Sequence, residues 1–211
     1  MTQAFACAAL LQGCKSNATA ARGDAGSPDV ANDAGGGALV EATGSECSAD
    51  WLDAASLCPS IVPEAGAVLL HAIGSGTQNY QCQVVASDAG VSYAWVFLGP
   101  RAILRGCNAA LIGHHFSSDA GAAAPEWQTL DGTYVVGRKT VAYTPEGGAG
   151  SVPWLLVGTT AHGGNGTLSK ATWVSRANVE GGIAPSTTCD ASTVGATESV
   201  GYAADYYFWG P

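Results

Sequence analysis

From Ile61 onward the chain consists of short runs rich in β-branched and aromatic residues, interrupted about every ten residues by Gly, Pro, Asn or Asp. Two neighbouring runs alternate with period two, the first through Tyr80, Cys82 and Val84 and the second over 91–97. Period two is the spacing of a β-strand with one buried face. The pattern therefore predicts an all-β domain, an antiparallel β-sandwich or barrel with one short N-terminal helix.

The two alternating runs are separated by Asp88-Ala-Gly90, which predicts a hairpin turn. A second turn is expected at Asp131-Gly132, and a third over 162–166 between two runs that we expect to pair. No G-x-G-x-x-G follows a predicted strand, which excludes a dinucleotide-binding α/β fold. Besides the hairpin, strands are expected at 67–72, 101–106, 109–115, 133–143, 153–160, 168–176 and 199–209.

The N-terminus resembles a bacterial lipoprotein signal. Residues 1–13 form a short apolar run that ends in Leu11-Gln12-Gly13 before Cys14, which resembles a lipobox with Cys14 as the lipidated residue. Residues 14–46 are small, polar, acidic and Gly-rich, a composition typical of a flexible tether. We therefore expect a single β domain over 47–211, exported and held at the outer membrane or cell surface; an ordinary cytosolic N-terminus is the alternative.

The charge balance limits the partners of this domain. The chain carries 17 acidic and 8 basic residues, a formal net charge of −9. Such a surface repels nucleic acid and anionic lipid, so nucleic acid is excluded as a partner. Because no stretch of about 20 apolar residues occurs, contact with a membrane is expected only through the lipid anchor.

Five cysteines remain beyond Cys7 and Cys14, and their spacing lacks any C-x-x-C pair, so disulfides are favoured over a metal cluster. Cys47 and Cys58 bracket a segment with helical spacing, which predicts a short helical turn closed by that pair. Cys82 and Cys189 form the predicted long-range bridge, which leaves Cys107 as the odd thiol. A Cys82–Cys107 bridge is the competing connectivity.

Histidines supply the candidate metal ligands. His71 and His115, with Tyr80 or Glu126 nearby, could hold copper or zinc. The principal expectation is nevertheless that the protein has no cofactor. Because His114 and His115 are neighbours in a predicted strand, at most one of them can share a site with His71. Candidates for a catalytic carboxylate pair are Glu126, Asp131 and Asp205, of which Asp131 is first a turn residue.

Aromatic residues supply the candidate ligand-binding surface. Trp95 and Phe97 alternate on a face that should be core, so Trp127, Trp154 and Tyr207 are expected to be exposed, where they could stack on a glycan. The candidate ligand-binding residues are His71, Tyr80, His115, Trp127 and Trp154.

The chain also resembles a known family over about residues 61–209. The resemblance is carried, in this order, by Gln78-Asn-Tyr80-Gln-Cys82, Trp95-Val-Phe97-Leu-Gly-Pro100, Gly113-His-His115, Trp127, Asp131-Gly132, Val136-Gly137, Pro153-Trp154-Leu-Leu156, Arg176, Gly181-Gly182, Pro185, Cys189 and Tyr202-Ala-Ala-Asp-Tyr206-Tyr-Phe208. These blocks are similar to domain of unknown function 3455, found in exported bacterial and fungal proteins. The resemblance implies a shared fold and no established activity.

Two classes of function follow from these observations. The first is an envelope-anchored binding or structural module for a glycan or a small envelope ligand. The second is a small metal-dependent or oxidative enzyme that uses His71 and His115, with Tyr80 and Trp127 lining the site. The sequence identifies no ligand and no oligomeric state.

Overall fold

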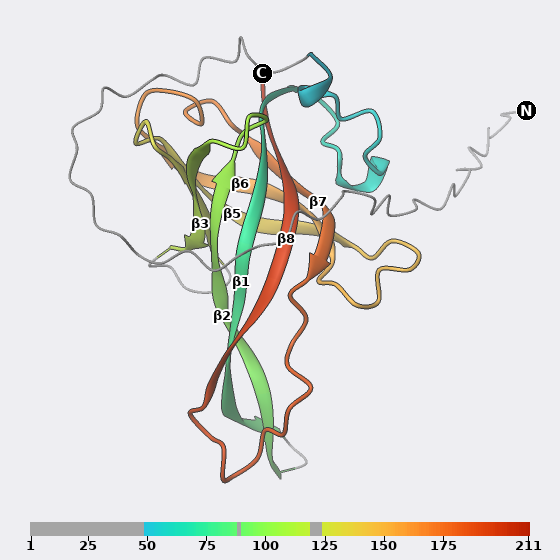
Figure 1. Cartoon of the computed structure of the whole chain (residues 1–211), viewed down its shortest axis with the longest axis vertical. Helices are drawn as coiled ribbons and strands as arrows, with labels where there is room; N and C mark the ends of the chain where they lie inside the picture. Colours follow the sequence, from blue (N-terminus) through green and yellow to red (C-terminus); the bar gives the residue numbers. More distant parts are fainter. Residues whose placement is uncertain (1–48, 88–89, 119–123) are drawn as a thin grey trace, which may run out of the picture.

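The computed structural model describes residues 49–87, 90–118 and 124–211. The predicted signal peptide, Cys14, the tether over 14–46 and Cys47 lie outside these residues. Eight antiparallel strands form a closed barrel in sequence order, and the first strand pairs with the last (Figure 1). The strands are β1 (Ala67–Ser87), β2 (Gly90–Arg105), β3 (Leu111–Ser117), β4 (Pro125–Thr129), β5 (Tyr134–Tyr143), β6 (Trp154–Gly163), β7 (Trp173–Gly181) and β8 (Thr197–Gly210).

The all-β prediction is confirmed, and the architecture is the barrel rather than the sandwich. In place of one short helix, two 3-10 segments precede the barrel, η1 (Ala49–Leu52) and η2 (Pro59–Ile61). No helix in the described part of the chain is long and apolar enough to cross a membrane.

β1 and β2 are longer than the sequence pattern predicts. Gly74-Ser75-Gly76 looks like a break between two strands, yet β1 continues through it for 21 residues. A Cβ at Gly74 would lie 2.5 Å from Cε2 of Tyr206, and a Cβ at Gly76 would lie 2.1 Å from the carbonyl oxygen of Arg101. These glycines therefore make room for neighbours inside the barrel and do not end the strand.

β4 is the strand that the sequence pattern misses. It is five residues long, and only Trp127 among them is a large apolar residue. Trp127 and Thr129 are buried while Glu126 and Gln128 are partly exposed, so the alternation is present but too short to be recognised.

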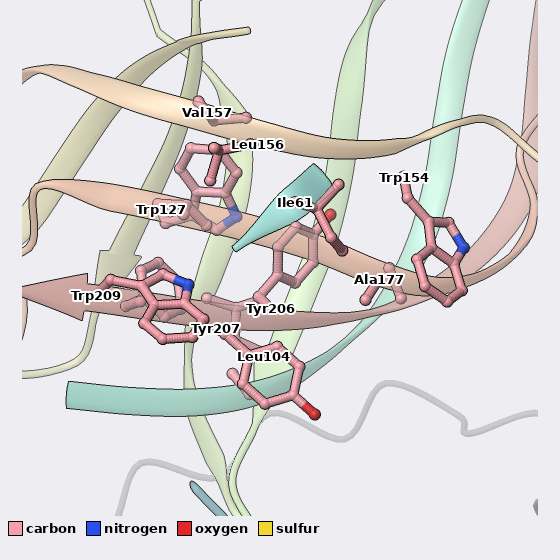
Figure 2. Packing of buried hydrophobic residues seen from close by; sticks show 14 of the residues in the cluster. Ile61, Leu104, Trp127, Trp154, Leu156, Val157, Ala177, Tyr206, Tyr207 and Trp209 are labelled. Atoms are coloured by element: carbon pink, nitrogen blue, oxygen red, sulfur yellow. The ribbon is translucent and has the colours of Figure 1, made fainter. Parts of the chain in front are cut away.

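The two faces of the sheet form different packing layers. On β8, Tyr206 and Phe208 face the barrel interior, where both rings meet Trp127 edge to face. Figure 2 shows Tyr206 and Trp127 among the buried residues of the core. Tyr207 and Trp209 point the other way, because successive side chains of a strand alternate. The interior is closed by buried apolar side chains that include Leu104, Val135, Val157 and Val174.

The segment that precedes β1 covers the outer layer. The His71 ring lies between Trp51 and Tyr207, with ring centroids 4.2 Å and 4.1 Å apart. The Ser175 hydroxyl donates to the carbonyl of Ile61 and accepts from the indole N–H of Trp209 at 2.8 Å. These contacts fasten the N-terminal segment to β1, β7 and β8.

β1, β2 and the start of β8 extend beyond the rest of the barrel, as the long ribbons at the bottom of Figure 1 show. The connection between β7 and β8 is held to this extension by a Cys82–Cys189 disulfide, which confirms the predicted long-range bridge. Cys58 and Cys107 each take part in a disulfide bond as well. The expectation that Cys107 is the odd thiol is therefore wrong.

The role of Gly76 predicts opposite effects for two glycine substitutions on paired strands. Gly76→Ala places a Cβ against backbone atoms of β2, and we expect it to lower the free energy of unfolding by about 2–3 kcal/mol. Gly201→Ala on β8 meets nothing within 4 Å and is expected to be neutral or slightly stabilising. Urea unfolding of both variants measures the difference; equal effects would contradict the close approach at Gly76.

Candidate ligand-binding site

A cavity of about 440 Å³ lies inside the barrel. Most of its wall is apolar or aromatic, and its polar groups come from β1, β3, β5 and β7. Arg138, Lys139 and Ala142 on β5 are exposed and form the rim of this cavity. The lining residues are Gln78, Tyr80, Phe97, Pro100, His115, Pro125, Trp127, Arg138, Lys139, Ala142, Val152, Pro153, Leu155, Val157 and Arg176.

His115 on β3 is held rigidly in the cavity wall. Its ring stacks on Trp127 of β4 with centroids 4.5 Å apart and an interplanar angle of 4°. Its Nδ1 lies 2.8 Å from the carbonyl oxygen of Glu126, which can only accept, so Nδ1 carries the proton of the neutral ring. Burial is the main cause that lowers the pKa of His115, to about 3. The hydrogen bond to the Glu126 carbonyl acts in the opposite direction, and the positive charge of Arg176 lowers the pKa further.

Arg176 on β7 is the charged centre of the cavity. Its Nη2 donates to the carbonyl of Pro153 at 2.7 Å. Burial raises the pKa of Tyr80, Tyr202 and Tyr206, and in each case the positive charge of Arg176 partly offsets that rise. The phenol of Tyr80 donates to the carbonyl of Gly182 at 2.6 Å, and the hydroxyls of Tyr202 and Tyr206 lie 3.1 Å apart.

The structure brings three of the five predicted ligand-binding residues together. Tyr80, His115 and Trp127 all line the cavity. Trp154 does not: it is buried elsewhere in the core, where its ring meets Tyr143 edge to face. His71 does not line the cavity either, because it lies in the outer layer against Tyr207, whereas His115 contacts Tyr206 on the inner face.

This arrangement separates the two histidines that were the candidate metal ligands. Nδ1 of His71 lies 2.7 Å from the carbonyl oxygen of Trp51, and Nε2 lies 3.5 Å from a carboxylate oxygen of Asp205. The sheet itself stands between His71 and His115, so they have no common site. Within residues 49–87, 90–118 and 124–211, no group of three or more His, Cys, Asp or Glu side chains is placed to hold a metal.

The expected exposure of the aromatic residues is wrong. Trp127, Trp154 and Tyr207 are only 2%, 3% and 5% exposed. Trp95 and Phe97 are half-buried instead of core, and the indole of Trp95 donates to the carbonyl of Thr187. The long extension of β1 and β2 carries Trp95 beyond the barrel, which the local alternation does not reveal.

Two of the candidate carboxylates have structural roles and do not line the cavity. Asp131 accepts hydrogen bonds from the side chains of Thr129, Thr133 and Thr167 and from two backbone N–H groups. Although burial raises its pKa, these hydrogen bonds hold the pKa well below its usual range. Asp205 accepts from the Asn178 amide at 2.7 Å and lies in the outer layer beside His71.

Arg176 and Gln78 line the cavity but are not among the ligand-binding residues predicted from the sequence. Gln78 is 2% exposed and lies on the same face of β1 as Tyr80. The signal available in the sequence was an arginine, Arg176, within the predicted strand 168–176. A charged residue in such a strand has either a structural partner or a functional role.

A closed eight-stranded antiparallel barrel with an aromatic, cationic interior cavity is the class of protein that this fold and site define. Residues 63–210 match the model of the family described as protein of unknown function DUF3455, and the chain belongs to that family. No curated protein and no solved structure matches the chain.

The buried state of His115 predicts a loss of stability at mildly acidic pH. Its ordinary pKa of 6.5 falls to about 3 on folding, so between these values the unfolded chain binds a proton that the native protein does not. Stability therefore falls as the pH drops below 6.5, by about 2 kcal/mol between pH 7 and pH 5.

Urea unfolding at pH 7 and pH 5 measures this loss in the wild type and in His115→Gln, which should lack it. His114→Gln is the matched control, because His114 is the neighbouring residue and is exposed. An unchanged pH dependence in His115→Gln would contradict the assignment.

The position of His71 predicts a structural role for that residue. We expect His71→Ala to lower the free energy of unfolding by about 2 kcal/mol, because it removes a stacked, hydrogen-bonded ring. Binding in the cavity should stay unchanged. Elemental analysis of the wild type and of His71→Ala tests the alternative that His71 is a metal ligand. A stoichiometric metal that is present in the wild type and lost in the variant would contradict the structural role.

Proposed function

We propose that the protein binds a small, largely apolar molecule inside the barrel. The cavity carries this proposal: its volume of about 440 Å³ falls within the range typical of small-molecule sites, roughly 300–1,000 Å³. Its wall combines apolar side chains such as Phe97, Leu155 and Val157 with a few polar groups, the usual composition of such sites.

A molecule enclosed by the barrel is favoured over a glycan on the surface. A surface glycan site needs exposed rings for stacking, and the rings once expected to be exposed are buried. Trp127 instead lines the cavity inside the barrel.

Binding is favoured over catalysis by the state of His115. A general base works best with a pKa near the operating pH. With a pKa of about 3, His115 is neutral but a weak base at neutral pH, and its stacked, hydrogen-bonded ring is suited to shaping a wall.

The lipidated Cys14 and the tether over 14–46 complete the proposal. An exported barrel on such a tether would hold its ligand at the outer membrane or cell surface while the barrel remained free to face the surrounding medium. Labelling with a radioactive fatty acid, compared between wild type and Cys14→Ser, tests this part.

Titration with the neutral fluorescent probe N-phenyl-1-naphthylamine tests the cavity. We expect saturable binding to the wild type and a loss of about ten-fold or more in affinity in Ala142→Trp, which fills the rim with a large ring. Ala94→Trp is the matched control, because Ala94 is exposed on β2 and does not line the cavity. Equal loss in both variants, or no saturable binding, would overturn the proposal.

A further inference from the structure

The basic residues of this acidic protein are unevenly distributed. Arg138, Lys139 and Arg176 are three of its eight Lys and Arg residues, and all three line the cavity of about 440 Å³ inside the barrel. No Asp or Glu lines that cavity. A protein with a net charge of −9 therefore encloses a site of the opposite sign.

Arg176 has no carboxylate partner in the described part of the chain. The close contact of a basic side chain with a carboxylate found there is that of His71 with Asp205 in the outer layer. Nη2 of Arg176 donates to Pro153, and its guanidinium lies against the hydroxyl of Tyr206, but Nε is buried with no acceptor. A partly desolvated cation without a counter-ion is costly to keep, which points to a partner from outside the described residues, such as a bound ligand.

Two further buried donors of the cavity wall lack an acceptor. The indole N–H of Trp127 has no hydrogen-bond partner. The amide of Gln78 lies beside the Tyr202 hydroxyl, yet its Nε2 has no acceptor within hydrogen-bond distance. Both side chains are 2% exposed, and both line the same cavity as Arg176. The wall thus offers donors and one cation to a ligand that can accept.

We propose that the ligand carries a carboxylate that pairs with Arg176, while an aromatic or aliphatic body fills the apolar part of the cavity against Trp127 and Val157. This inference rests on the proposed binding function and specifies its ligand class. A guanidinium and a carboxylate match in shape and charge and form strong charge-assisted hydrogen bonds. Because Arg176 is the one lining cation away from the exposed rim, a monoanion is favoured over a phosphate dianion.

The rim and the volume fit the same class of ligand. Arg138 and Lys139 are exposed, so they attract an anion toward the cavity and leave its final pairing to Arg176. A liquid water molecule occupies about 30 Å³, so the cavity holds on the order of fifteen waters or a ligand with a similar number of non-hydrogen atoms. A bicyclic aromatic acid is of this size.

Two isosteric probes test the inference on the intact domain. 2-Naphthoate carries the carboxylate, and 2-naphthamide has the same shape without the charge. Each is used to displace N-phenyl-1-naphthylamine at pH 7. We expect the carboxylate to bind about ten-fold or more tightly than the amide.

Substitution of the arginine should remove this preference. In Arg176→Met the two probes should bind equally, while the neutral fluorescent probe still binds, which shows that the variant is folded. Lys170→Met is the control for the change in net charge, because Lys170 is exposed and away from the cavity, and it should keep the wild-type preference.

The outcomes separate the two proposals. If the wild type binds the fluorescent probe but does not prefer 2-naphthoate over 2-naphthamide, the carboxylate inference is wrong and the binding function stands. If none of the three molecules binds, the binding function itself is wrong. The comparison in the wild type decides the inference even if Arg176→Met does not fold.

Discussion

The pairing of β1 with β8 is the interaction on which the rest of the structure depends. This ladder joins the first strand to the last along nearly the whole of β8, so it converts an open sheet into a closed barrel. It also requires Gly74, since a side chain there would meet the Tyr206 ring of β8; Gly76 makes the matching room on the other side of β1, for the backbone of β2. Closure therefore fixes the ring of Tyr206 inside the barrel, next to His115 and Trp127, and so shapes the wall of the cavity.

The alternation of side chains along β8 explains why two histidines that look equivalent in the sequence have different roles. Tyr206 contacts His115 inside the barrel, and the next residue, Tyr207, stacks on His71 outside it. His71 thereby fastens the N-terminal segment, with one nitrogen at the carbonyl of Trp51. His115 stiffens the cavity wall. A single strand thus contacts both the N-terminal segment, through Tyr207, and a residue of the cavity wall, through Tyr206.

Much of the fold was predictable because local alternation is preserved wherever one face of a strand is buried. The hairpin of β1 and β2, the pairing of β6 with β7, and the Cys82–Cys189 bridge were expected from the sequence. The site was predictable only in part. His115 and Trp127 are cross-strand partners on the neighbouring strands β3 and β4, whereas Arg176 on β7 comes to line the same cavity as Tyr80 on β1 through closure of the ring, and no local pattern records such contacts. For the same reason the exposure of Trp127 could not be judged from its neighbours in the sequence.

The placement of Arg176 links the stability of the barrel to its proposed function. Replacing a buried polar group by an apolar one of similar shape is often neutral or stabilising, so a barrel selected for stability alone gains little from an arginine at this position. The interior instead holds this cation together with the unpartnered N–H of Trp127 and the amide of Gln78. A carboxylate ligand would supply Arg176 with the counter-ion that the described residues do not provide, and its oxygens are acceptors of the kind that the other two donors lack. Ligand binding would then stabilise the fold by pairing the groups that are most costly to leave alone.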